Sequence, residues 1–179
     1  MDLPLKLCPS CGLCCNGVLF GDVELQRGDD AAALAAEGLA LFVKGRKRAF
    51  AQPCACLTGG LCRIYQTRPR RCQTFACRQL QLVQAGRLTA EAAQANIRRA
   101  RREVDEVLRL VRSLGNTNEQ MPLNRRYADL MAQPLDFAGD ESQLERRGEL
   151  MVAVGRLVDL LERDFLSPEP TRSTDLSAA

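Results

Sequence analysis

The spacing of nine cysteines constrains this 179-residue chain more than any other feature. Four of them open the sequence in a C-x2-C-x2-C-C pattern, five follow between residues 54 and 77, and none occurs after that. Thiolates separated by two residues in a turn can converge on one metal ion, because the turn brings the sulfurs at i and i+3 together. We therefore interpret the clustered cysteines as metal ligands rather than as ordinary packing residues.

The donor set restricts the choice of metal. The chain has no histidine, so a zinc site would consist of sulfur alone, or of sulfur with a carboxylate or water. All-thiolate coordination suits zinc, cuprous copper or an iron–sulfur cluster and disfavours magnesium and calcium. Neighbouring side chains in an extended chain point to opposite sides. If Cys14 and Cys15 are both ligands, we expect them to face different metals or different edges of one cluster.

Other uses of cysteine fit less well. A secreted disulfide scaffold would also be rich in cysteine, but residues 1–13 show no signal peptide and nine is an odd number. A redox dithiol would need a C-x2-C motif in a βαβ setting, which is missing here. A structural metal and a metal or cluster with a functional role both stay open. Cys56 is expected to be a small buried apolar residue.

Taken together, the cysteine segments resemble the CxxCxxCC family of zinc- or iron-chelating proteins, which is mostly bacterial and archaeal and includes flagellin lysine N-methylase. The resemblance covers about residues 5–80: the run CPSCGLCC at 8–15, the Cys54 to Cys62 segment and the IYxxRPxxC motif that ends at Cys72. Cys56 stands where the family usually has an aromatic or apolar residue. The resemblance therefore implies eight metal ligands: Cys8, Cys11, Cys14, Cys15, Cys54, Cys62, Cys72 and Cys77.

We expect a cytoplasmic protein that coordinates an iron–sulfur cluster or Zn²⁺ through these thiolates. The alternative is an iron–sulfur-dependent enzyme, such as a protein lysine N-methylase-like or redox protein. Eight thiolates exceed what a single structural zinc needs, which favours iron–sulfur slightly, although two zinc sites would use the same number. The chain has no Walker loop, no G-x-G-x-x-G and no histidine for acid–base chemistry, so no catalytic residue is assigned.

Charge is distributed unevenly. Residues 61–102 carry ten arginines against the single acidic residue Glu91, whereas residues 103–179 carry nine arginines against fifteen acidic side chains. Few aromatic residues interleave with the arginines, so we do not expect nucleic acid as a partner. We expect the arginines to offset thiolate charge and to meet the acidic C-terminal half. No apolar run approaches the roughly 20 residues that cross a bilayer, so we expect no membrane partner.

The predicted fold class is α+β and mostly helical. Residues 1–88 should form a small cysteine-rich metal-binding module with short strands, residues 89–166 a helical hairpin lobe, and residues 167–179 a disordered tail. Within the module we predict a strand at 17–20, a helix from Asp29 to Ala36, a hairpin of 41–43 with 48–52, a tight turn at 58–60 and a short helix that starts at Pro69 and contains Cys72. That helix must end or bend before Cys77 if both sulfurs are to reach one site.

The C-terminal half shows helical periodicity. We predict helices over 90–114, with Thr89 as the cap, over 123–131 and over 141–165. The two long helices should bury their apolar faces against each other as a hairpin. The alternative is that these faces form the seam of a dimer. We also expect the helical lobe to bind a protein partner, which the sequence does not identify. Tyr65 and Arg68 are candidates to orient the sulfurs, with core packing as the other role for Tyr65. The predicted apolar face of the helix over 90–114 comprises Ile97, Ala100, Val104, Val107, Val111 and Leu114. That of the last helix comprises Leu144, Met151, Val154, Leu157, Val158 and Leu161.

Overall fold

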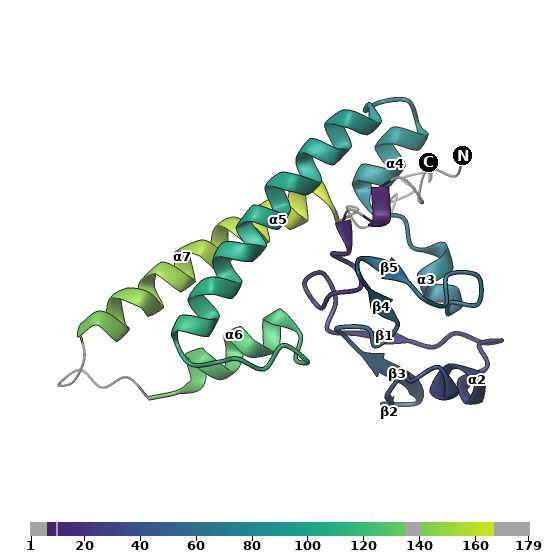
Figure 1. The fold of residues 1–179 in the computed structure, drawn as a ribbon, viewed down its shortest axis with the longest axis horizontal. Coiled ribbons are helices and arrows are strands. Elements are labelled where there is room, and N and C mark those ends of the chain that lie inside the picture. Colours follow the sequence, from purple (N-terminus) through teal and green to yellow (C-terminus); the bar gives the residue numbers. More distant parts are fainter. Residues whose placement is uncertain (1–6, 10, 135–140, 167–179) are drawn as a thin grey trace, which may run out of the picture.

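A computed structural model of the chain describes residues 7–9, 11–134 and 141–166. It is mostly helical with two small antiparallel sheets, which confirms the predicted α+β class. The helical hairpin extends to one side of the strand-containing part (Figure 1). The elements are β1 (Asp22–Glu24), α2 (Ala31–Ala36), β2 (Leu41–Lys44), β3 (Lys47–Ala51), β4 (Leu57–Thr58), β5 (Leu61–Cys62), α3 (Arg70–Thr74), α4 (Arg78–Gln84), α5 (Ala90–Ser113), α6 (Leu123–Ala132) and α7 (Glu141–Asp164).

The larger sheet has three antiparallel strands in the order β1-β3-β2. Its β2–β3 hairpin turns at Gly45, as predicted, and Phe50 pairs with Leu41 on one side and Val23 on the other. The strand predicted at 17–20 is wrong, because the first strand begins only at Asp22. Residues 16–18 turn instead: the Asn16 side chain accepts a hydrogen bond from the Val18 N–H, and Gly17 has a φ of 80°.

Helix α2 starts two residues later than predicted. Asp30 is its cap, and one carboxylate oxygen of Asp30 accepts the N–H groups of Ala32 and Ala33. Asp29 is left free to bind elsewhere, and its carboxylate accepts the backbone N–H of Arg70 at 2.8 Å. An aspartate expected inside the helix therefore connects the sheet region to the start of α3.

The second hairpin joins β4 to β5 through Gly59 and Gly60, which confirms the predicted turn at 58–60. Both glycines have positive φ angles, 57° and 85°, which suit a two-residue turn of this kind. A β-carbon added at Gly60 would lie only 2.6 Å from the carbonyl oxygen of Pro9, whereas one at Gly59 would meet nothing within 4 Å. The hairpin tip therefore packs directly against the N-terminal cysteine segment.

Helix α3 ends before Cys77, as the predicted site required. Pro69 is the residue before its first turn rather than the first helical residue, and Cys72 lies inside the helix. Cys77 precedes the first residue of α4, a helix that the sequence did not predict. No side chain caps α4 and no acidic residue lies in its first turn, so the usual signals of a helix start are missing.

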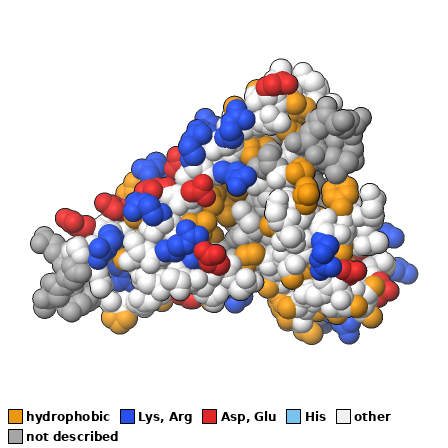
Figure 2. Space-filling view, in the orientation of Figure 1, with side chains coloured by type: hydrophobic (Ala, Val, Ile, Leu, Met, Phe, Trp, Pro, Cys, Tyr) orange, Lys and Arg blue, Asp and Glu red, His pale blue; other side chains and the backbone are white. Residues whose placement is uncertain are grey.

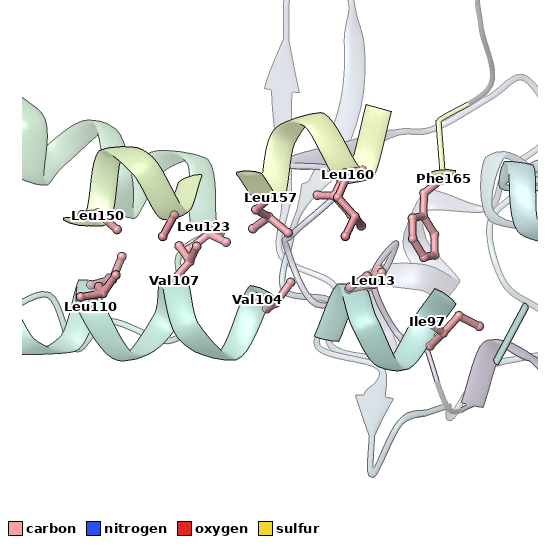
Figure 3. Packing of buried hydrophobic residues seen from close by; sticks show 14 of the residues in the cluster. Leu13, Ile97, Val104, Val107, Leu110, Leu123, Leu150, Leu157, Leu160 and Phe165 are labelled. Atoms are coloured by element: carbon pink, nitrogen blue, oxygen red, sulfur yellow. The ribbon is translucent and has the colours of Figure 1, made fainter. Parts of the chain in front are cut away.

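The two long helices pack against each other as an antiparallel hairpin, which confirms that prediction (Figures 1 and 3). Thr89 caps α5 by accepting the Ala92 N–H. The apolar face of α5 was predicted correctly, but the face of α7 was partly wrong: Met151 and Val158 are 57% and 44% exposed. The buried face of α7 is rotated and comprises Leu150, Ala153, Leu157, Leu160 and Leu161, and it continues into Phe165, the residue after the helix.

Two apolar cores stabilise the fold. The smaller core comprises Val23, Leu34, Leu39, Phe50, Cys56 and Ile64. The larger one lies between α5, α6 and α7, and it also contains residues of the cysteine-rich half, among them Leu7, Leu13 and Leu80. Figure 3 shows Leu13, from the first cysteine run, pointing into the seam toward Leu160 and Phe165. Leu13 is fully buried, so the first cysteine run is anchored in the helical core.

The C-terminal end of α7 is bonded to the start of α4. The Arg78 N–H donates to the Phe165 carbonyl at 2.9 Å, and the buried Gln79 amide donates to the Asp164 carbonyl and accepts from Asn96. These bonds satisfy polar groups that two helix ends would otherwise leave unpaired. They also fix the backbone next to Cys77.

The proposed division at residues 88 and 89 stays a prediction, and the tail 167–179 lies outside the described residues. Among the helices that the structure describes, none has the length and apolar character needed to cross a membrane.

We predict that Leu13→Ala lowers the free energy of unfolding by about 2–5 kcal/mol, because it removes a fully buried leucine from a packed seam. The matched control is Val152→Ala in α7, where the valine is 60% exposed. This substitution should change the free energy of unfolding by less than about 0.5 kcal/mol. Denaturant unfolding monitored by circular dichroism measures both. Similar small losses for the two variants would contradict this role of Leu13.

We also predict that Gly60→Ala destabilises the protein more than Gly59→Ala. Each substitution places a side chain at positive φ, which costs about 1–2 kcal/mol. Only the alanine at residue 60 would also collide with the Pro9 carbonyl. The comparison of the two thermal midpoints tests this contact, and equal midpoints would argue against it.

Candidate metal centre

The eight predicted ligand cysteines all line one cavity of about 1020 Å³. Its walls come from the N-terminal cysteine run, the two small sheets, α3, α4 and the facing ends of α5 and α7, including Ile97 and Phe165. Cys56 is not among the lining residues: it is fully buried, and its thiol lies 3.5 Å from the Glu37 carbonyl. All nine cysteines are free thiols. The assignment of ligands itself stays a prediction, but the structure brings the eight candidates to one place.

The first cysteine run begins with helical backbone at Cys8 and Cys11 and continues in a tight turn through Cys14 and Cys15. The Gly12 N–H donates to the Cys8 carbonyl, and the Gly12 carbonyl accepts the N–H groups of Cys15 and Asn16. Gly12 has a φ of 69°, which glycine adopts without strain. As a result the Cys14 and Cys15 sulfurs lie only 3.6 Å apart. The expectation that they point to opposite sides was based on an extended chain, and it does not hold in this turn.

Backbone hydrogen bonds hold the second cysteine set against the first. The Cys54 N–H donates to the Cys15 carbonyl at 2.8 Å. The Cys54 carbonyl accepts the N–H of Leu57, and Leu57 pairs with Cys62 across the β4–β5 hairpin. Cys15, Cys54 and Cys62 are therefore connected by main-chain bonds that do not depend on a metal.

Cys72 and Cys77 reach the cavity from α3 and from the start of α4. The Phe75 ring, at the end of α3, packs edge-to-face on Phe20 with a centroid distance of 5.0 Å. This contact holds the end of α3 against the segment that follows the first cysteine run. Cys77 is positioned by the bonds between α4 and α7 described above.

Burial keeps most of these thiols protonated. It raises the pKa of Cys11 to about 12, that of Cys72 to about 12 and that of Cys54 to about 11, and it also raises the pKa of Cys77. The hydrogen bond between the adjacent thiols lowers the pKa of Cys14 and raises that of Cys15. A bound cation would reverse this preference, because metal coordination deprotonates a thiol.

The donor set fits a thiophilic metal, but the sulfurs are not closed around one point. Among residues 7–9, 11–134 and 141–166, no three cysteine or acidic side chains form a group that could already hold a metal ion. Most of the cysteines lie on turns or next to helix ends, where rotation of a side chain can move a sulfur without breaking a long element. Soft sulfur donors in this number favour zinc or iron over magnesium or calcium.

Arg68 and Tyr65 also line the cavity. The Arg68 guanidinium lies 3.8 Å from the centre of the Tyr65 ring and donates a hydrogen bond to the Tyr65 carbonyl. A second bond from Arg68, at 3.4 Å, reaches the carbonyl of Cys72. Arg68 therefore joins the IYxxRPxxC motif to the ligand-bearing helix and places a positive charge at the cavity wall.

Other charged residues near the cavity and in the arginine-rich segment form ion pairs. Asp22 and Glu24 line the cavity on β1 and form ion pairs with Lys44 at 2.8 Å and Lys47 at 2.7 Å. From the arginine-rich segment, Arg99 pairs with Asp164 at 2.6 Å. On the face shown in Figure 2, basic and acidic side chains alternate along the helical hairpin. The expectation about nucleic acid stays a prediction.

The sequence did not point to two residues that position the site. Leu13 is the apolar residue inside the first cysteine run, and its anchoring role could have been suspected from a leucine flanked by Gly12 and Cys14. Gln79 carries no such signal, because α4 contains three glutamines and nothing in the sequence distinguishes the buried Gln79 from Gln81 and Gln84.

Comparison with protein families adds one finding. Residues 7–99, just over half of the chain, match the model of the CxxCxxCC family, which is described as "Putative zinc- or iron-chelating domain". The match extends beyond the cysteines through α4 into the first part of α5. Comparison with curated proteins and with solved structures gave no significant match. The chain belongs to the CxxCxxCC family of cysteine-rich, metal-chelating domains.

Proposed function

We propose that this protein binds an iron–sulfur centre through the eight cysteines of the cavity: Cys8, Cys11, Cys14, Cys15, Cys54, Cys62, Cys72 and Cys77. The observation that carries the proposal is that these eight, and not Cys56, line one cavity of about 1020 Å³. Iron and sulfide bound there would supply electron-transfer chemistry.

The size of the cavity supports a cluster over a mononuclear zinc site. Zinc sits about 2.3 Å from each of four sulfurs, so a structural zinc site needs no space beyond its own ligands. A cluster inserts several iron and sulfide atoms between the thiolates and needs an internal volume. The apolar part of the wall, with Phe20, Phe50, Ile64 and Phe165, supports the same choice, because burial and solvent exclusion tune a cluster.

A cytoplasmic location is part of this proposal, since a reducing compartment keeps nine free thiols available to metal. We also propose that the α5–α7 hairpin presents the centre to a protein partner. The hairpin extends away from the strand-containing part (Figure 1), and its end near residues 97 and 165 forms one wall of the cavity. This arrangement would couple a contact on the hairpin to the metal centre.

We predict that protein purified without oxygen contains iron and acid-labile sulfide and absorbs visible light. Cys62→Ala should lower the iron content, whereas the matched Cys56→Ala should leave it unchanged, because Cys56 lies outside the cavity. Metal analysis and absorption spectra of the three proteins measure this. Zinc without iron in the wild-type protein would refute the iron–sulfur proposal, and equal metal loss in both variants would refute the ligand set.

We further predict that metal uptake releases protons. The pKa values of Cys11, Cys54 and Cys72 are raised to between about 11 and about 12, so these thiols are protonated at neutral pH. Zn²⁺ added to metal-free protein must displace those protons, about four for each four-thiolate ion, and its apparent affinity must rise with pH. Calorimetric titration in buffers of different ionisation enthalpy counts the protons. Binding without proton release would show that the metal is held by groups other than these thiols.

A further inference from the structure

We propose that the eight cysteines form two separate four-thiolate sites rather than one eight-thiolate centre. The first site comprises Cys8, Cys11, Cys14 and Cys77, and the second comprises Cys15, Cys54, Cys62 and Cys72. This inference rests on the proposed function, namely that these thiols bind metal, and it does not depend on which metal is bound.

The two apolar cores divide the ligands in this way. Cys11 and Cys77 pack against the larger core, the one formed with α5 and α7. Cys54, Cys62 and Cys72 pack against the smaller core beside the three-stranded sheet. Residues of both cores line the cavity, among them Phe165 of the larger core and Phe50 of the smaller one, so its thiols belong to two walls. Each wall is held by its own core, because close-packed side chains leave few alternative arrangements.

Main-chain bonds support the same division. The Cys15 carbonyl accepts a hydrogen bond from the Cys54 N–H. Leu57, which is three residues after Cys54, pairs with Cys62 in the β4–β5 hairpin. These bonds attach Cys15 to the second wall. On the first wall, the bond from the Gly12 N–H to the Cys8 carbonyl closes one turn that contains Cys11. The helical core then fixes the position of this turn through Leu13.

Cys14 and Cys15 divide between the two walls. Their sulfurs lie 3.6 Å apart. A main-chain bond attaches Cys15 to Cys54, whereas Cys14 directly follows Leu13, which is buried in the larger core. The boundary between the two sites therefore runs between two consecutive residues of the chain.

The two-site arrangement explains why the first run ends in two adjacent cysteines, Cys14 and Cys15. One turn delivers a sulfur to each site, so the two centres lie side by side in one cavity. Four thiolates around a divalent ion leave a net charge of −2, so two such sites would carry −4 together. Arg68 and Arg71 both line the cavity and would offset part of this charge.

The test compares two adjacent substitutions, Cys14→Ala and Cys15→Ala, in the full chain loaded with its metal. Bound thiols resist alkylation by iodoacetamide, and mass spectrometry reports the modification of each cysteine separately. Cys14→Ala should lose half of the metal and expose Cys8, Cys11 and Cys77. Cys15→Ala should also lose half of the metal but expose the complementary set, Cys54, Cys62 and Cys72.

Cys56 provides an internal control for folding, because its fully buried thiol becomes reactive only when the chain opens. If either variant exposes Cys56, the same comparison is made with Cys77→Ala and Cys62→Ala, which should release the first and the second set respectively. The two-site proposal is overturned if both variants of a pair expose the same cysteines to iodoacetamide. It is also overturned if each variant loses all of its metal. Wild-type protein that takes up neither iron nor zinc instead overturns the proposed function on which it rests.

Discussion

The burial of Leu13 in the seam between α5 and α7 is the contact on which the rest of this structure depends. Leu13 lies between Cys11 and Cys14, so its burial holds the backbone that carries both cysteines. Burying a leucine is worth about 1.5–3 kcal/mol, enough to hold a short turn in place. The long helices therefore serve the cysteine-rich part directly: they provide the apolar pocket that a loop with few aromatic residues cannot build for itself.

A second set of contacts fixes the last of the eight candidate ligands, Cys77. Cys77 precedes α4, and the first N–H group of α4, that of Arg78, donates to the carbonyl of Phe165, the residue that follows α7. Gln79 completes this junction through Asp164 and Asn96. Both walls of the cavity are thus held by contacts made without metal. The buried thiols can then stay protonated until a cation replaces their protons.

Local signals predicted the parts of the fold that depend on short stretches of sequence. Thr89 as a helix cap, Gly45 and Gly59-Gly60 as hairpin turns, and the apolar face of α5 all follow from backbone preference or periodicity. The failures have physical causes. Residues 17–20 end in a short apolar run that favours a strand, but the Asn16 side chain stabilises a turn there. The buried face of α7 was predicted partly wrongly because it depends on where α5 lies. The spacing of apolar residues along α7 carries no information about the position of α5.

For the candidate site, the sequence by itself determined which donor atoms are available: nine cysteines in two clusters and no histidine. It also separated Cys56 from the rest through the family pattern, and the structure places Cys56 outside the cavity. Which thiols share a wall was decided only by the tertiary structure. The reason is that a sulfur's position follows the backbone that carries it, and that backbone is held by partners far away in sequence: Cys15 with Cys54, Gly60 against Pro9, and Arg78 with Phe165.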